Sequence, residues 1–238
     1  MSTFFGVPVD AAYHIVFALA GMLAPLLGSL AAAAAIALFT VGVRLLLMPV
    51  SYRAMKGMDA QARIAPQVRA LRQRHAGQPE ALKRALAALY RAEGTSVYAG
   101  CLPIAVQWPF FSVMYLVFRS PVIEGMRNAL LTHDFFGAPL GSHWLSAAGP
   151  FSAHGAVFAG LFLLLAGLGW LSTRMTRGLA APGSGGAPAA LAKVVPYLTV
   201  AFAAFLPLAS GLYLATTSSW TLAERAVLRR RLNAARPA

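Results

Sequence analysis

Long apolar blocks alternate with shorter polar segments along the chain. Three of these blocks, residues 29–50, 97–119 and 152–172, reach the roughly 20 apolar residues that a transmembrane helix needs. Each is therefore predicted to be one membrane span. A fourth apolar stretch, 194–223, contains Pro207 near its middle, and only the distribution of charge around it decides how often it crosses.

Basic residues divide the polar segments into two kinds. The segment 51–95 carries nine Lys or Arg residues, whereas the first 43 residues carry none and 120–150 carries only Arg127. Lys and Arg collect on the cytoplasmic side of membrane proteins. We therefore predict that 51–95, 173–193 and the basic C-terminal tail lie in the cytoplasm, and that the N-terminus and 120–150 lie outside.

The fourth stretch must cross an even number of times, because Lys193 and Arg225 flank it and both are expected inside. We predict a hairpin of two short helices, 194–206 and 208–224, that turns near Pro207. Each helix would be only about 22 Å long, so a thinned bilayer is expected around them. The alternative is one long helix with the basic tail outside, which breaks the charge rule.

Composition supports a membrane protein and excludes several other classes. Hydrophobic residues make up 58% of the chain and charged residues 11%, against about 25% charged residues in soluble domains. A net charge of +13 would indicate nucleic-acid binding in a soluble protein, but the predicted topology accounts for it. Cys101 is the only cysteine, which excludes an intramolecular disulfide and any zinc site with two cysteine ligands.

Residues 1–28 are apolar, but we predict that they form a helix in the outer membrane interface. Asp10 and His14 share one helical face, so the helix is amphipathic. Gly28 then ends it before the first span. The alternative is a signal peptide cleaved within Ala31–Ala35, although Asp10 and the lack of a basic N-terminal region are atypical of one.

The cytoplasmic segment 51–95 is predicted to be a helical hairpin. Helices at 53–75 and 79–93 are joined by a Gly-Gln-Pro turn, and Pro66 predicts a kink or a break in the first helix. One interpretation is a solvated hairpin whose bases only enforce topology or lie near anionic lipid. The other is a docking surface for a polyanionic partner such as the ribosome, formed by Arg69, Arg72, Arg74, Lys83 and Arg84.

Arg44 is the residue that most clearly indicates a function inside the membrane. It lies about 7–8 Å from the inner end of the first span, where charge is rare. The alternative is that its side chain snorkels to the headgroups. No span offers an Asp or Glu deep in its interior, so we expect no buried ion pair but a hydrated groove. Further polar residues of the spans are predicted to line this groove: Thr40, Gln107, Ser210, Thr216, Thr217 and Ser219.

Catalytic motifs are not found. The chain lacks the His-Glu-x-x-His and Gly-x-Ser-x-Gly patterns and has no paired carboxylates within a span. We therefore predict no enzyme, no metal site and no cofactor, and we expect Cys101 to be a packing residue.

Several motifs follow one another along the chain: the arginine-bearing span Val43–Ser51, Leu89–Gly94 followed by Gly100–Pro103 and Gln107–Phe111, and Pro207 with Ser210–Leu212. Together and in this order, they resemble the YidC/Oxa/Alb family of membrane-protein insertases over about residues 4–228. The resemblance departs at Ser96-Val97, Ala215-Thr216 and Trp220, where family members usually have Asn-Pro, an aromatic pair and Asn.

The resemblance implies an all-α membrane protein in which five spans surround a hydrophilic groove that opens to the cytosol. The predicted insertase core is 29–228, preceded by the interfacial helix and followed by a basic cytoplasmic tail, 229–238. The expected location is the bacterial cell membrane, with the N-terminus outside and the C-terminus in the cytoplasm.

The resemblance further implies an insertase that draws the hydrophilic tail of a nascent membrane protein into the groove through Arg44 and releases the substrate's transmembrane segment into lipid. The implied partners are nascent membrane proteins, the ribosome, the Sec translocon and the lipid bilayer, without a specific nucleic acid. The alternative from another class is a small transporter that binds an anionic solute at Arg44. Against the transporter, the chain has no internal repeat of the kind common in transporters.

Overall fold

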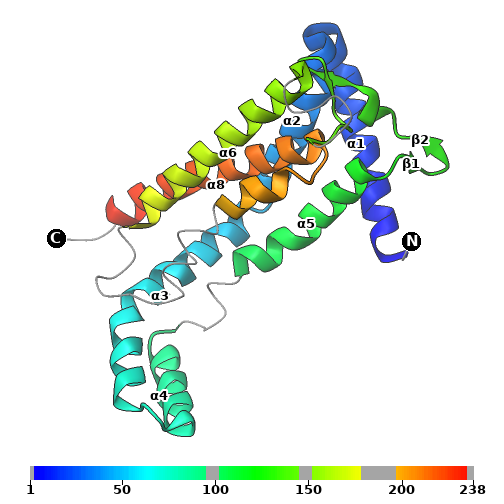
Figure 1. The fold of residues 1–238 in the computed structure, drawn as a ribbon. Helices are drawn as coiled ribbons and strands as arrows, with labels where there is room; N and C mark the ends of the chain where they lie inside the picture. Colours follow the sequence, from blue (N-terminus) through cyan, green and yellow to red (C-terminus); the bar gives the residue numbers. More distant parts are fainter. Residues whose placement is uncertain (1–2, 95–101, 145–151, 178–196, 235–238) are drawn as a thin grey trace.

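A computed structural model of the protein describes residues 3–94, 102–144, 152–177 and 197–234 (Figure 1). Cys101 and the beginning of the predicted span 97–119 lie outside the described residues. Most described residues are helical, and a further short helical segment covers 197–203. The principal helices are α1 (Thr3–Leu27), α2 (Ala31–Leu46), α3 (Met48–Arg74), α4 (Pro79–Ala92), α5 (Leu102–Arg119), α6 (Ala153–Arg177) and α8 (Leu208–Ala234).

The breaks between the first helices follow local backbone chemistry. Gly28 has a φ of +53°, a conformation that favours glycine, and it starts the 3-10 turn η1 (Gly28–Leu30) between α1 and α2. The predicted span 29–50 is divided, because α2 ends at Leu46 and α3 begins at Met48. Pro49 stands in the first turn of α3, where its missing N–H costs no helical hydrogen bond.

Helices α3 and α4 form the predicted hairpin and project from the rest of the molecule (Figure 1). Gly77, with a φ of +85°, lies in the turn between them. Pro66 does not break α3, which stays helical to Arg74 and bends along its course (Figure 1). A break at Pro66 is therefore excluded, and a kink at this residue stays a prediction.

The turn before α8 is held by the loop that follows α5. The backbone N–H groups of Leu208 and Ala209 donate to the carbonyls of Ser142 (2.9 Å) and Leu140 (3.0 Å). Pro207 precedes α8 as predicted, because proline cannot continue the preceding helix. At its other end α8 runs on to Ala234, beyond the predicted end at 224, and so includes the beginning of the predicted tail.

The loop 120–144, called the outer loop below after the side of the membrane predicted for it, contains two short antiparallel hairpins in a fold otherwise predicted to be all-α. Asn128 organises it, and its side chain is almost fully buried. Its Nδ2 donates to the carbonyls of Val117 (2.6 Å) and Ser120 (3.0 Å), and its Oδ1 accepts from the Leu130 N–H (3.1 Å). The loop elements are β1 (Val122–Ile123), β2 (Met126–Arg127), η3 (Ala129–Thr132), β3 (Asp134–Phe135) and β4 (Ala138–Pro139), paired β1 with β2 and β3 with β4.

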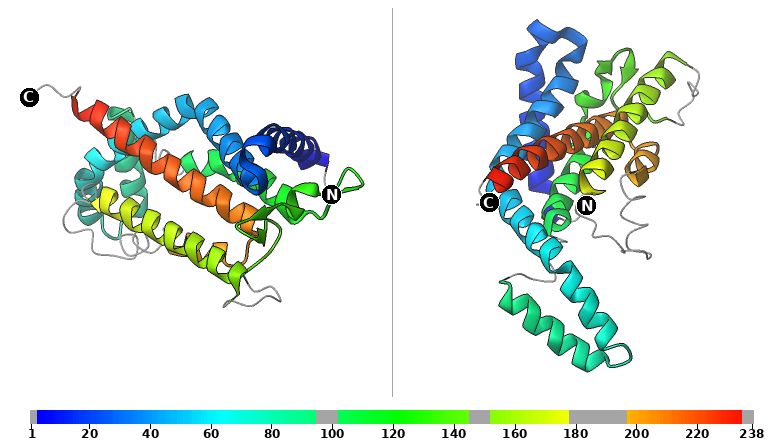
Figure 2. Two further views of the ribbon diagram at one scale, coloured as in Figure 1. Left: turned by 90° about the horizontal axis from the view of Figure 1, so that it is seen from above. Right: turned by 90° about the vertical axis from the view of Figure 1, so that its left-hand side faces the viewer.

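The outer loop and the α3–α4 hairpin lie at opposite ends of the molecule (Figure 1). Helix α1 is at the outer-loop end. In the left view of Figure 2, α1 is seen end-on, whereas α6 and α8 are seen lengthwise. The His14 Nε2 and Glu124 Oε2 atoms, 2.9 Å apart, join α1 to the outer loop. Among the described residues, two helical stretches, Gly6–Leu46 and His154–Met175, are long and apolar enough to span a membrane. Five spans and an interfacial α1 remain predictions.

The contact between α6 and α8 depends on Gly211. A Cβ at this position would lie 2.5 Å from Leu161 Cδ2, and Leu161 is buried. We expect Gly211→Ala to destabilise the protein by about 1 kcal/mol, because overpacking a core outweighs the gain in helix propensity. Thermal unfolding in detergent measures this. The matched control is Gly160→Ala on α6, where nothing lies within 4 Å of an added Cβ. Equal unfolding temperatures for the two variants would contradict the prediction.

Candidate functional site

A cavity of about 490 Å³ lies between α1, α2, α5 and α8. Each helix contributes residues at helical spacing, for example Thr40 and Arg44 on α2 and Tyr213 and Thr217 on α8. Its wall consists of Pro8, Ala11, Ala12, Ile15, Phe39, Thr40, Val43, Arg44, Leu47, Gln107, Pro109, Phe110, Val113, Met114, Tyr213 and Thr217.

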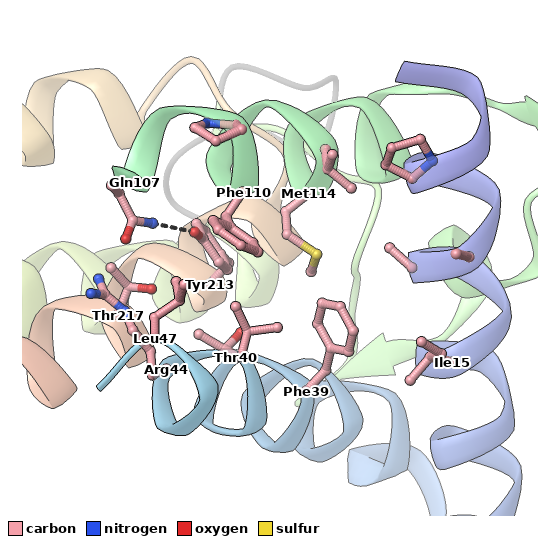
Figure 3. Close-up of a pocket in the computed structure, with 16 residues that line it drawn as sticks. Ile15, Phe39, Thr40, Arg44, Leu47, Gln107, Phe110, Met114, Tyr213 and Thr217 are labelled. Carbon is pink, nitrogen blue, oxygen red and sulfur yellow. Dashed lines mark hydrogen bonds between the residues drawn. The ribbon is translucent and has the colours of Figure 1, made fainter. Parts of the chain in front are cut away.

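The two ends of the cavity differ in chemistry (Figure 3). Arg44, Gln107, Tyr213 and Thr217 gather at one end, where the Gln107 amide donates a hydrogen bond to the Tyr213 hydroxyl. Apolar side chains such as Ile15 form the other end, beside α1. The polar end is near the start of α3, because Arg44 comes four residues before Met48.

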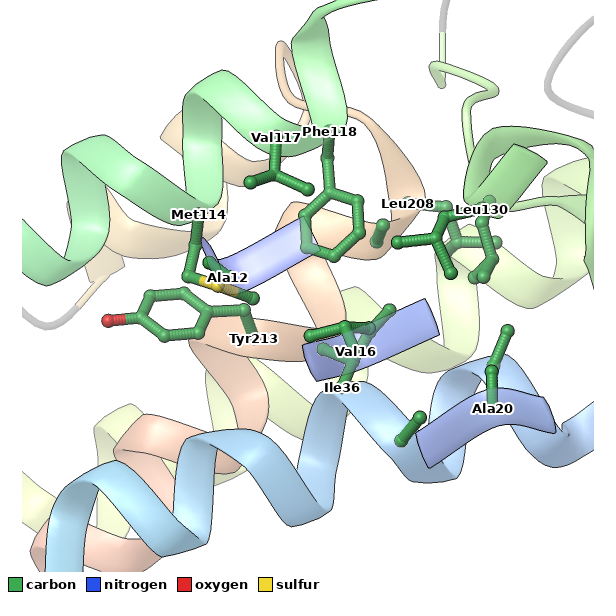
Figure 4. Packing of buried hydrophobic residues seen from close by; sticks show 14 of the residues in the cluster. Ala12, Val16, Ala20, Ile36, Met114, Val117, Phe118, Leu130, Leu208 and Tyr213 are labelled. Carbon is green, nitrogen blue, oxygen red and sulfur yellow. The ribbon is translucent and has the colours of Figure 1, made fainter. Parts of the chain in front are cut away.

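The apolar end is continuous with the buried core at the outer-loop end (Figure 4). Ala12 of α1 and Met114 of α5 belong both to the cavity wall and to the core cluster. Val16 of α1 is fully buried in the same cluster and packs with Phe118 of α5. The apolar end of the cavity therefore borders the buried core.

Of the predicted groove residues, the structure brings Arg44, Thr40, Gln107 and Thr217 together in the cavity wall. The hydroxyl of Thr40 donates to the carbonyl of Ile36 at 2.7 Å and therefore has only its lone pairs free for other partners.

The other three predicted residues lie on α8 but not in the wall. Ser210 is buried beside the turn at Pro207, and Thr216 donates to the carbonyl of Leu212 at 2.9 Å. Ser219 is exposed. Contact of any of these residues with a substrate stays a prediction.

Two residues of the site were missed in the sequence. Tyr213 stands one turn before Thr217, so helical spacing was a signal that it shares the same face. Glu224 is only 8% exposed and interacts electrostatically with Arg44. The sequence interpretation, which placed no acidic residue deep in a span, overlooked Glu224 as a buried acidic residue that acts on Arg44. It failed because Glu224 lies at the edge of the last apolar stretch in the sequence, and the packing of α8 on α2 buries it.

The predicted docking bases surround the tip of the α3–α4 hairpin. Lys83 forms an exposed ion pair with Glu80, with Nζ and Oε1 2.9 Å apart. Such surface pairs contribute at most about 1 kcal/mol, so this one leaves Lys83 available for a polyanion. Arg72, Arg74, Lys83 and Arg84 are exposed and Arg69 is partly buried. Among the described residues, no three His, Cys, Asp or Glu side chains gather as a metal site would require.

Long apolar helices and a cavity with one cationic end define a helical membrane protein with an internal polar site. Residues 22–235 match the family described as 60Kd inner membrane protein. The chain therefore belongs to this family, the YidC/Oxa/Alb family, and is a membrane protein.

Curated relatives are similar to part of the chain. The membrane protein insertase YidC of Helicobacter pylori (strain J99) is 34% identical over 101 residues, which cover 42% of this chain and 18% of the relative. That of Acidiphilium cryptum is 42% identical over 106 residues, 42% of this chain and 17% of the relative. That of Cupriavidus metallidurans is 38% identical over 90 residues, 38% and 16% respectively. The chain thus matches less than a fifth of the length of these relatives.

Proposed function

We propose that this protein is a membrane-protein insertase that works without an enzymatic step. The observation that carries the proposal is the cavity with Arg44 at its polar end and α1 lining its apolar end. The relatives' name, membrane protein insertase, supports the same function.

The mechanism follows from the cost of moving polar groups through lipid. A hydrophilic tail loses its water in hydrocarbon, at several kcal/mol for each unsatisfied backbone group. The polar end of the cavity shortens this path, since Arg44, Gln107 and Tyr213 offer hydrogen-bonding groups within the helices. An acidic tail gains Coulomb energy at Arg44. Transfer of the substrate's apolar segment into lipid then drives release, at about 0.8 kcal/mol per buried CH₂.

Buried polar atoms on α8 also support passage of a polar segment. Ser210 Oγ, Thr217 Oγ1, Trp220 Nε1 and Glu224 Oε1 are buried and have no hydrogen-bond partner among the described residues. The four positions are spaced by seven, three and four residues, so they follow one face of the helix. Buried polar groups are normally satisfied, so this face is suited to water or to the backbone of a polar segment.

Reconstitution tests the function directly. Proteoliposomes that contain this protein alone should insert a small single-span substrate, measured by protease protection of its translocated tail. Insertion at the level of empty liposomes would overturn the proposal. Uptake of an anionic solute without insertion would instead identify a transporter.

For the membrane topology we propose five spans, with the N-terminus and the outer loop outside and the α3–α4 hairpin and the C-terminus in the cytoplasm. In a Cys101→Ser background, we expect Met126→Cys in the outer loop to react with an impermeant maleimide from outside intact cells. Gln73→Cys in the hairpin should react only after the membrane is opened. Both positions are exposed. Labelling of both from one side would contradict this topology.

We further propose that the tip of the α3–α4 hairpin docks the ribosome, and that nascent chains also reach this protein through the Sec translocon. We expect the triple substitution of Arg69, Arg72 and Arg74 by Gln to weaken ribosome cosedimentation several-fold, because fewer cations then face the polyanion. A raised salt concentration should weaken ribosome binding by the unsubstituted protein in the same way. The control replaces Arg229, Arg230 and Arg231, which changes the charge equally at the end of α8. Equal loss in the two variants would assign the effect to net charge alone.

A further inference from the structure

Glu224 is a buried carboxylate whose charge the mechanism above does not use. Its side chain is 8% exposed, and Oε1 has no hydrogen-bond partner among the described residues. Acidic residues are rarely buried to this degree unless a cation compensates them, since a buried unpaired charge costs several kcal/mol. The charges that face Glu224 therefore decide what it does.

Two cations and two polar side chains act on the Glu224 carboxylate. Arg44 on α2 and Arg225, the next residue of α8, attract it electrostatically, while the side chains of Ser51 on α3 and Trp220 on α8 lie beside it. The Arg44 guanidinium in turn interacts electrostatically with Tyr213 and Glu224. The Arg44 guanidinium and the Glu224 carboxylate form no direct ion pair, although both residues are described. The two charged groups thus attract one another without a direct ion pair.

In the proposed topology, the direction of α8 places Glu224 on the cytoplasmic side of the cavity. The outer loop holds the first residues of α8, and Thr217 lines the cavity, so Glu224 lies two turns, about 10 Å, further from the outer loop. A polar segment that enters from the hairpin end passes Glu224 on its way to the cavity. A charged group on this segment therefore interacts with both Glu224 and Arg44 rather than with Arg44 alone.

We propose that Glu224 is the resident counter-charge of Arg44 and sets the charge selectivity of the groove. An acidic tail must replace Glu224 as the counter-charge of Arg44, and the Glu224 carboxylate repels the tail during this exchange. A basic tail is instead attracted by the Glu224 carboxylate. The groove then accepts tails of moderate charge rather than holding acidic tails tightly. This inference rests on the proposed insertase function and concerns which substrates the site prefers.

The experiment is insertion of one single-span substrate with an acidic, a neutral or a basic tail. In Glu224→Gln, we expect insertion of the acidic tail to rise about three- to tenfold relative to the neutral tail, and that of the basic tail to fall. Glu93→Gln is the matched control, because it removes the same charge at an exposed position outside the cavity. The control should leave all three ratios unchanged.

A double substitution tests whether Glu224 acts through Arg44. In an Arg44→Ala background, the rise caused by Glu224→Gln should fall below twofold, because the cavity cation for which the tail and Glu224 compete is absent. Arg225 remains in both backgrounds and does not line the cavity. An unchanged acidic-to-neutral ratio in Glu224→Gln would overturn the proposal, as would an equal rise with and without Arg44. If Glu224→Gln does not fold, Glu224→Asp replaces it; this variant retracts the carboxylate by one methylene and should raise the ratio by a smaller factor.

A binding measurement distinguishes failure of the proposed role of Glu224 from failure of the proposed insertase function. Fluorescent acidic and neutral tail peptides are titrated against the purified protein in detergent, which requires no insertion. Tighter binding of the acidic peptide alone in Glu224→Gln supports the role of Glu224 even where no substrate is inserted. Unchanged binding of both peptides overturns it, whatever the result of reconstitution.

Discussion

Arg44→Ala is expected to reduce insertion of a substrate with an acidic tail at least tenfold, while Arg44→Lys keeps most of the activity. Unit charges about 4 Å apart attract by about 4 kcal/mol at an effective dielectric of 20 before desolvation, and roughly 1.4 kcal/mol changes a rate tenfold. Neutral tails should be affected less, since they lack the Coulomb attraction. Insertion of matched acidic and neutral tails by the variants in proteoliposomes measures the effect.

The control for Arg44 is Arg174→Ala, which removes one cation from α6, where Arg174 stacks on Trp170 with 4.2 Å between its Cζ and the ring centroid. Arg174 does not line the cavity, so both tails should insert normally. Full activity of Arg44→Ala with every tail would mean that Arg44 only snorkels to the headgroups. Equal loss for acidic and neutral tails would mean that Arg44 hydrates the groove rather than pairing with substrate charge.

Asn128→Ala is expected to destabilise the protein by about 3 kcal/mol, the largest effect on stability predicted here. The substitution removes the donor to the carbonyls of Val117 and Ser120 at the end of α5 and the acceptor for the Leu130 N–H. Each buried group left unsatisfied costs about 1–3 kcal/mol. Thermal unfolding in detergent measures the loss. Because Asn128 does not line the cavity, the folded variant should insert substrates normally at low temperature.

The control for Asn128 is Thr132→Ala in the same loop. The Thr132 hydroxyl also donates to a backbone carbonyl, that of Ala129 at 2.8 Å, but this residue is exposed and water replaces the bond. We expect a change below about 0.5 kcal/mol. If both variants unfold at the same temperature as the unsubstituted protein, the side-chain bonds of Asn128 do not hold the outer loop to α5.

The placement of the helices was largely predictable from the sequence. Gly28, the turn at 77–79 and Pro207 separate helices as predicted, because the backbone limits of glycine and proline act within a few residues. The division at Leu47 was not predicted, since apolar composition continues through it.

Membership of the cavity was only partly predictable. Thr216 and Thr217 are adjacent and chemically identical, yet only Thr217 lines the cavity, because neighbouring helical residues point about 100° apart. The rotation of α8 about its axis therefore decides between them. That rotation is set by its contacts with α2 and α6, including the close approach at Gly211, and these involve residues far apart in the chain.

The sequence by itself determined the apolar blocks, the basic hairpin, the proline and glycine breaks and the presence of an arginine where apolar residues dominate. These depend on composition and on spacing within one segment. Only the tertiary structure decided that Tyr213 joins Gln107 at the polar end of the cavity and that Glu224 is buried within reach of Arg44. The physical reason is that burial and electrostatic pairing are properties of the space between helices, which neighbouring positions in the sequence do not define.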